Sequence, residues 1–142
     1  MSFLLDTNVV SDLKARRPDA HVTRWIEGQD PESVFLSVIT IGELNRGIQR
    51  LPDSGRKKVL SNWLTGDLLV LYGDRVLPLD LPVMMTWGAL VARMEANGQL
   101  IPVIDSLLAA TATHHGLTMA TRNVRDFKPT GITIVNPWES PP

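Results

Sequence analysis

The sequence predicts a single α/β domain with a parallel sheet, spanning residues 1–142. Short apolar segments alternate along the chain with longer segments in which apolar residues recur every three or four positions. These are the patterns of strands and of amphipathic helices. No internal repeat, low-complexity tract or linker-like change of composition interrupts the alternation. Such an alternation over this length favours one α/β unit with a core of its own.

The N-terminal half is expected to contain two strands and four helices. They are a strand at 2–5, helices at 8–15 and 21–27, a strand at 33–37, and helices at 40–49 and 56–64. In the third helix Ile41, Leu44 and Ile48 form an apolar stripe at helical spacing. Gly28 is a stop signal for the second helix, and the turn cluster 52–55 separates the last two.

The C-terminal half is expected to add three strands and two helices. They are a strand at 76–79, helices at 82–96 and 105–115, and strands at 117–121 and 132–135. The pair Asn97-Gly98 ends the first of these helices and Gly116 ends the second. An irregular tail follows, marked by Pro137, Pro141 and Pro142.

Four acidic residues, each placed after an apolar segment expected to be a strand, are the candidate functional residues. They are Asp6 after 3–5, Glu43 beyond 34–37, Asp105 after 101–104 and Asp126 beyond 117–121. The carboxyl ends of parallel strands converge on one crevice, so acids far apart in sequence can meet there. Clustered carboxylates resist ionisation unless cations are present. The sequence therefore predicts a site for Mg²⁺, with Mn²⁺ as the alternative ion.

Each acid also has a local structural interpretation. Glu43 lies three residues after Thr40, which is the spacing of a capping box. Asp105 could stabilise the start of its helix through the helix dipole, and Asp6 could be a simple N-cap. Asp126 could be an ordinary loop residue. Four separate local roles at one edge of a sheet are less expected than one shared site.

The charge distribution permits a nucleic-acid partner. The formal net charge is −1, and leaving out the four acids gives −1 + 4 = +3. Two basic groups adjoin Glu43 and Asp126: Arg46, Arg50, Arg56, Lys57 and Lys58 in the first, and Arg122, Arg125 and Lys128 in the second. Both groups could hold phosphates beside the acids. The alternative is a solvated helix face and a solvated loop.

The composition also limits the chemistry and the location. The chain has no cysteine, so catalysis must use oxygen and nitrogen groups, and a reducing compartment is expected. The N-terminus lacks the pattern of a signal peptide. No apolar stretch reaches the roughly 18 residues that a membrane span requires. We therefore expect a cytoplasmic protein with no membrane segment.

Four segments resemble, in order, the motifs of PIN-domain nucleases of the VapC/FitB toxin type. They are residues 3–11 (Phe-Leu-Leu-Asp-Thr-Asn-Val-Val-Ser), 36–44 (Leu-Ser-Val-Ile-Thr-Ile-Gly-Glu-Leu), 105–112 (Asp-Ser-Leu-Leu-Ala-Ala-Thr-Ala) and 121–127 (Thr-Arg-Asn-Val-Arg-Asp-Phe). The closing Asn136-Pro137-Trp138 resembles the FitB-like branch. The similarity runs nearly end to end.

This resemblance implies a three-layer fold, with a five-stranded parallel sheet flanked by helices, and a role for most of the residues named above. Asp6, Glu43 and Asp105 match the acids that bind the catalytic metal, and Asp126 matches a fourth. Supporting positions are matched by Thr7 and Asn8 beside the first acid, by Thr121 at the pocket edge, and by Asn123, which could share the role of Asp126. The resemblance also implies a homodimer and a co-encoded DNA-binding antitoxin, through which alone the protein would meet operator DNA.

The implied activity is that of a ribonuclease toxin. A divalent ion held by Asp6 and Asp105, with a second between Glu43 and Asp126, would activate water for in-line attack on an RNA phosphodiester. The expected RNA contacts are Arg46, Arg50, Arg122 and Arg125. The antitoxin is expected to block the site with a basic side chain, preferably Arg, placed among the acids.

An acid after the first strand also suits two other classes of protein. Aspartyl-phosphate phosphatases and receiver domains also build acidic Mg²⁺ pockets on parallel sheets. They are disfavoured because no second Asp stands two positions after Asp6 and no Lys lies at a late strand end. The other alternative is a catalytically weak PIN-like domain that binds nucleic acid or its antitoxin.

Overall fold

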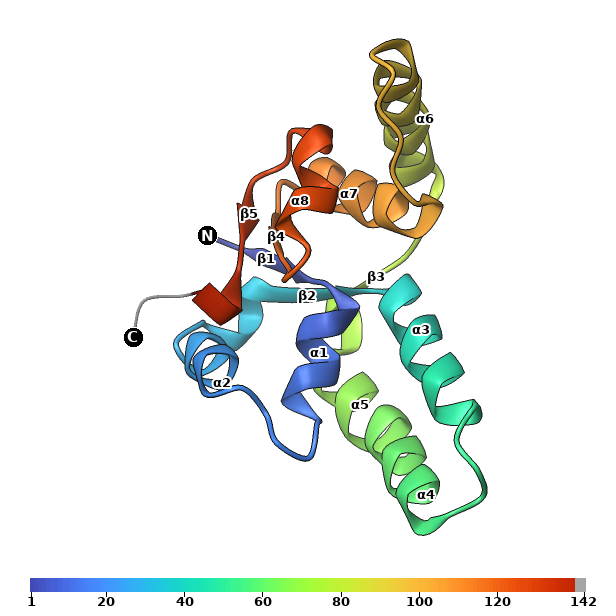
Figure 1. The fold of residues 1–142 in the computed structure, drawn as a ribbon. Coiled ribbons are helices and arrows are strands. Elements are labelled where there is room, and N and C mark those ends of the chain that lie inside the picture. Colours follow the sequence, from blue (N-terminus) through green and yellow to red (C-terminus); the bar gives the residue numbers. More distant parts are fainter. Residues whose placement is uncertain (140–142) are drawn as a thin grey trace.

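Five short parallel strands form the sheet of the computed structural model, which describes residues 1–139. They are β1 (Phe3–Leu5), β2 (Val34–Ser37), β3 (Val76–Leu77), β4 (Thr118–Ala120) and β5 (Ile134–Val135). The strand order is β3-β2-β1-β4-β5, with Phe3 of the central strand beside Val34 on one side and Thr118 on the other (Figure 1). The strands expected at 2–5, 33–37, 76–79, 117–121 and 132–135 are confirmed with their parallel pairing, although each is shorter than expected.

Helices cover both faces of this sheet, as Figure 1 shows. One face carries α1 (Thr7–Leu13), α2 (Ala20–Glu27), α3 (Val38–Gln49), α4 (Gly55–Asn62) and α5 (Leu69–Tyr72), and the other carries α6 (Leu81–Ala96), α7 (Val103–His115) and α8 (Val124–Phe127). The predicted three-layer arrangement is therefore confirmed. Pro137 lies in a 3₁₀ turn, Pro137–Glu139, while Pro141 and Pro142 lie outside the described residues.

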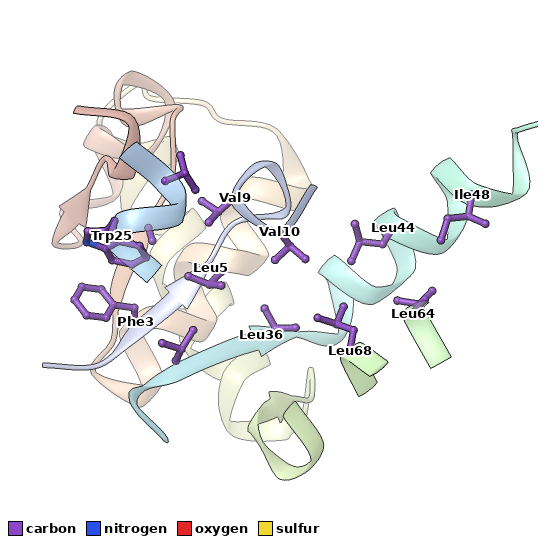
Figure 2. Close-up of a cluster of buried hydrophobic side chains, with 13 residues drawn as sticks. Phe3, Leu5, Val9, Val10, Trp25, Leu36, Leu44, Ile48, Leu64 and Leu68 are labelled. Carbon is purple, nitrogen blue, oxygen red and sulfur yellow. The ribbon is translucent and has the colours of Figure 1, made fainter. Parts of the chain in front are cut away.

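The alternation of side chains along β1 separates two hydrophobic cores. Phe3 and Leu5 point into the core shared with α1, α2 and α3, whereas Leu4 points into the core shared with α6 and α7. In the first core the rings of Phe3 and Trp25 meet edge to face, with centroids 4.9 Å apart (Figure 2). Leu5, fully buried in the same core, fixes the end of β1, from which Asp6 follows.

The helix expected at 56–64 extends further than the sequence indicated. A π-helical turn, Trp63–Leu68, continues α4 into α5, which ends at Gly73 with a positive φ of 47°. The wider π turn keeps both Leu64 and Leu68 buried against the first core. A regular 3.6-residue period does not anticipate this continuation.

The apolar run 101–104 is not a strand, so that expectation was wrong. Pro102 precedes the first turn of α7, a position that proline tolerates, and Val103 and Ile104 are 63% and 41% exposed. Asp105 consequently lies in the first turn of a helix. Within residues 1–139, no helix combines the length and apolar character needed to cross a bilayer.

Candidate active site at the carboxyl ends of the strands

Asp6 lies where the strand order reverses, the position at which open α/β sheets form a crevice. The chain passes from β1 to β2 on one side and later crosses to β4 on the other. The Asp6 backbone N–H donates to the Ala120 carbonyl at 2.9 Å, which joins the ends of β1 and β4. Asp6 is buried, and its Oδ1 accepts from the Thr7 backbone N–H at 2.7 Å as the N-cap of α1. The interpretation of Asp6 as an N-cap is therefore correct for its Oδ1 atom.

The second carboxylate oxygen of Asp6 is held by Thr121. The Thr121 hydroxyl, fully buried after β4, donates to Asp6 Oδ2 at 2.7 Å. Its Oγ1 in turn accepts from the Asn123 backbone N–H at 3.0 Å and from Asn8 Nδ2 at 3.4 Å. Both Asp6 oxygens are therefore oriented by residues of two different strand ends.

Glu43 reaches the same region from the second turn of α3. The Thr7 hydroxyl donates to Glu43 Oε1, with 2.5 Å between the oxygens, and lies 3.1 Å from Thr40 Oγ1. The capping-box interpretation of Glu43 is wrong, because the N-cap is Ser37, whose hydroxyl accepts from the Ile39 backbone N–H. Glu43 is free to serve the site.

Asp105 and Asp126 complete the acidic edge from the opposite side of the sheet. Burial raises the pKa of Asp105 to about 6, and repulsion from Asp6, Asp126 and Glu43 adds to the effect. Burial also raises the pKa of Asp6, although the hydrogen bonds from Thr121 and Thr7 oppose that rise. Asp126 lies exposed in α8. The structure thus brings the other three predicted acids within electrostatic range of Asp105, and Glu43 within range of Asp6.

The oxygen atoms that these side chains offer are the ligands that a hard divalent cation prefers. All four acids offer oxygen, a cation would relieve their repulsion, and Asn8 Oδ1 is buried beside them without a hydrogen-bond partner. In the described part of the chain, however, no three acidic or imidazole side chains are already arranged around one ion position. Binding a metal through three of these acids would require side-chain movement.

The four arginines expected to contact RNA occupy two flanks of the acidic edge. Arg46 and Arg50 are exposed three and seven residues after Glu43, on the same face of α3. On the other flank Arg125 is exposed in α8, and the Arg122 guanidinium stacks 5.2 Å from the centroid of the Trp138 ring. Within residues 1–139 none of the four forms an ion pair.

A groove between α1, α3 and α4 reaches Glu43, and sequence reasoning missed it. This α3 groove has a volume of about 260 Å³, with Glu43 in its wall. Leu44, Ile48 and Trp63 make much of its lining apolar, Lys14 and Arg56 add two basic side chains, and a Cβ at Gly47 would meet nothing within 4 Å. The groove arises from the angle between three helices, for which the sequence carries no local signal.

The raised pKa of Asp105 predicts a stability gain when its charge is removed. A carboxyl whose pKa rises from 3.8 to about 6 on folding binds more protons in the folded state between those values. Its contribution to stability is therefore greatest below pH 3.8, declines up to about pH 6 and stays low above it. Metal-free Asp105→Asn should melt a few degrees above the wild type at pH 8, and the difference should shrink at pH 4.

Thermal unfolding followed by circular dichroism in a chelating buffer checks this expectation. Asp67→Asn is the matched control, because the Asp67 side chain is exposed and forms no ion pair within residues 1–139. A lower melting temperature for Asp105→Asn at pH 8 would contradict the electrostatic description of the site.

Comparison with known proteins agrees with this architecture. The family model described as "PIN domain" matches residues 3–131, so the chain belongs to the PIN domain family. It is 40% identical over 136 residues to VapC ribonuclease Y4jK of Sinorhizobium fredii, covering 96% of this chain and 97% of that protein. It is 36% identical over 135 residues to toxin FitB of Neisseria gonorrhoeae, covering 95% and 97%.

Solved structures also show similarity to toxins of this type. The crystal structure of FitAcB from Neisseria gonorrhoeae matches with a TM-score of 0.93 at 36% identity, covering 97% of this chain and 99% of that one. A structure of FitAB bound to an IR36 DNA fragment matches with a TM-score of 0.92 at 33% identity, covering 99% and 98%. The expected resemblance to VapC/FitB toxins is confirmed.

Proposed function

We propose that this protein is a metal-dependent endoribonuclease toxin whose activity a partner protein suppresses. The observation that carries the proposal is the meeting of four acids at the strand-order reversal of a PIN fold, where burial, and then the charges of the other three acids, raise the pKa of Asp105. Relatives named VapC ribonuclease and toxin FitB support RNA as the substrate class. A cytoplasmic location and a homodimer belong to the same proposal.

The chain's own residues would prepare the site for a phosphodiester. Asp6 and Asp105 would hold Mg²⁺ or Mn²⁺, with Glu43 and Asp126 completing the set. Such an ion, when bound, lowers the pKa of a coordinated water and stabilises the leaving oxygen. Thr121 and the Thr7 backbone N–H fix the Asp6 carboxylate in advance of substrate.

The flanking arginines would hold the RNA backbone across the acids. Arg46 and Arg50 would approach the RNA from α3 and Arg125 from α8. Within residues 1–139 none of them forms an ion pair with an acidic side chain, so their guanidinium groups are available to phosphate. One guanidinium group can bind two oxygens of a phosphate through parallel hydrogen bonds. Such contacts position the RNA strand without reading its bases. Arg122 with Trp138 adds a cation–aromatic surface suited to an unpaired nucleotide.

The α3 groove is the proposed seat of the inhibitory partner. Its apolar lining suits an amphipathic segment, and its Glu43 wall would bring the end of that segment to the acids. A partner Arg could pair there with two carboxylates and displace the cation. The neighbours FitAcB and FitAB, the latter bound to DNA, support a partner that also contacts operator DNA.

Cleavage assays on RNA and DNA of one sequence test the proposal. Partner-free protein with Mg²⁺ should cut the RNA strand at internal positions and leave the DNA strand intact, with mapping of the new 5′ ends defining the sites. Binding of RNA without cleavage would instead support the weak, non-catalytic PIN-like alternative.

A further inference from the structure

We propose that Thr40 is a positioning residue that fixes the Glu43 carboxylate through the hydroxyl of Thr7. The inference rests on the proposed function only in that Glu43 serves the acidic site. Thr7 Oγ1 lies 2.5 Å from Glu43 Oε1 and 3.1 Å from Thr40 Oγ1, so one hydroxyl joins two side chains of α3 to the start of α1. Thr40 itself faces no substrate, since it is fully buried.

Counting protons gives the direction of this chain of hydrogen bonds. A threonine hydroxyl has one proton to donate and two lone pairs to accept with. At 2.5 Å the Thr7 hydroxyl donates its single proton to the Glu43 carboxylate, because short O–H···O⁻ hydrogen bonds are the stronger, charge-assisted kind. The longer contact is therefore a hydrogen bond that Thr40 donates and Thr7 accepts.

The burial of Thr40 supports the same direction. A buried hydroxyl needs an acceptor for its proton. Two other threonines donate to a carbonyl four residues earlier, Thr111 to Leu107 and Thr65 to Ser61. Thr40 makes no such bond in the described part of the chain, where the only polar partner of its hydroxyl is Thr7.

The hydrogen bonds from Thr40 to Thr7 and from Thr7 to Glu43 form what we call the Thr40 relay. It matters because Glu43 is a long side chain at a partly exposed position. Free in solution it would populate several rotamers, and holding one of them costs conformational entropy. A Thr7 hydroxyl that already accepts from Thr40 has its proton directed at Glu43, so the carboxylate is oriented before any ligand arrives. Sequence reasoning placed Thr40 only in a capping box and missed this role.

Two substitutions separate positioning from packing. Thr40→Val keeps the shape and removes the hydroxyl, whereas Thr40→Ser keeps the hydroxyl and removes a buried methyl group. Thr40→Val should cleave RNA about fivefold more slowly, the loss of one net hydrogen bond, with little change in melting temperature. Thr40→Ser should melt lower but cleave at close to the wild-type rate. A purely structural Thr40 predicts that rate and melting temperature fall together.

A second measurement does not depend on catalysis or on metal. In metal-free protein, NMR side-chain couplings and relaxation of Glu43 should indicate one rotamer in the wild type and in Thr40→Ser, but rotamer averaging in Thr40→Val. In a Thr7→Val background, Thr40→Val should produce no further averaging. Equal ordering of Glu43 in the wild type and Thr40→Val would overturn the inference. Wild-type protein that orders Glu43 but never cleaves RNA would instead overturn the proposed function alone.

Discussion

Asp6→Asn should lower the rate of RNA hydrolysis by roughly 10²-fold or more, the loss typical of removing an electrostatic element of a transition state. The substitution isolates the charge. Asn is as good an N-cap as Asp, so its Oδ1 can still accept from the Thr7 backbone N–H. Its amide nitrogen cannot replace the oxygen that accepts from Thr121, because Thr121 Oγ1 already accepts from Asn123 and Asn8. The fold should nevertheless persist, since removing a charge that burial disfavours opposes the loss of that one hydrogen bond.

The other acids should rank according to their surroundings. Asp105→Asn should lose activity as severely as Asp6→Asn, because Asp105 experiences the charges of all three other acids. Asp126→Asn should be milder, since Asp126 is exposed and the Asn123 side chain, which forms no cap hydrogen bond, lies nearby as another oxygen donor. Initial rates on one RNA substrate check the order. Asp126→Asn as the most damaging change, with Asp6→Asn nearly silent, would refute the ligand assignment.

Gly47→Phe should free the nuclease from its partner while leaving cleavage intact. The position lines the α3 groove, and a Cβ there would meet no atom within 4 Å, so the ring would occupy the space proposed for the partner's segment. Loss of a packed segment of this kind should weaken the complex by roughly 10²-fold or more, comparable with truncating an interface hot spot. Because Gly47 is exposed within α3, a side chain there should not destabilise the helix.

Co-expression with the neighbouring gene product gives the measurement for this variant. RNA cleavage should persist in the Gly47→Phe sample and be suppressed in the wild type. Gly88→Phe is the matched control, an exposed helical glycine of α6 with equal free space outside the groove. A complex that forms and inhibits equally well with Gly47→Phe would place the partner elsewhere.

Much of the fold could be predicted because its signals are local. The apolar run of β1, the Ile41–Leu44–Ile48 stripe and the helix stop at Gly116 each fix an element through its own residues. The sequence misled at 101–104, where exposed Val103 and Ile104 resemble a buried strand. Apolar composition alone does not state whether a segment is buried.

The site likewise has a part that could be predicted from the sequence and a part that could not. The four acids could be chosen from the sequence because parallel strand ends converge, and the order reversal at β1 and β4 brings them to one edge. The hydrogen bond from Thr7 to Glu43 joins positions 36 residues apart, and the one from Thr121 to Asp6 joins positions 115 apart. Such contacts depend on how elements pack, so neither the Thr40 relay nor the α3 groove had a local pattern to reveal it.

The central claim is that these carboxylates act by holding a divalent cation. Its most direct test is the initial rate of RNA cleavage by partner-free protein in EDTA, followed by titration with Mg²⁺ or Mn²⁺ in the same sample. We expect no cleavage in EDTA and full recovery when free metal is restored, with Asp6→Asn staying roughly 10²-fold or more below the recovered wild-type rate. Undiminished cleavage by the wild type in EDTA would contradict it.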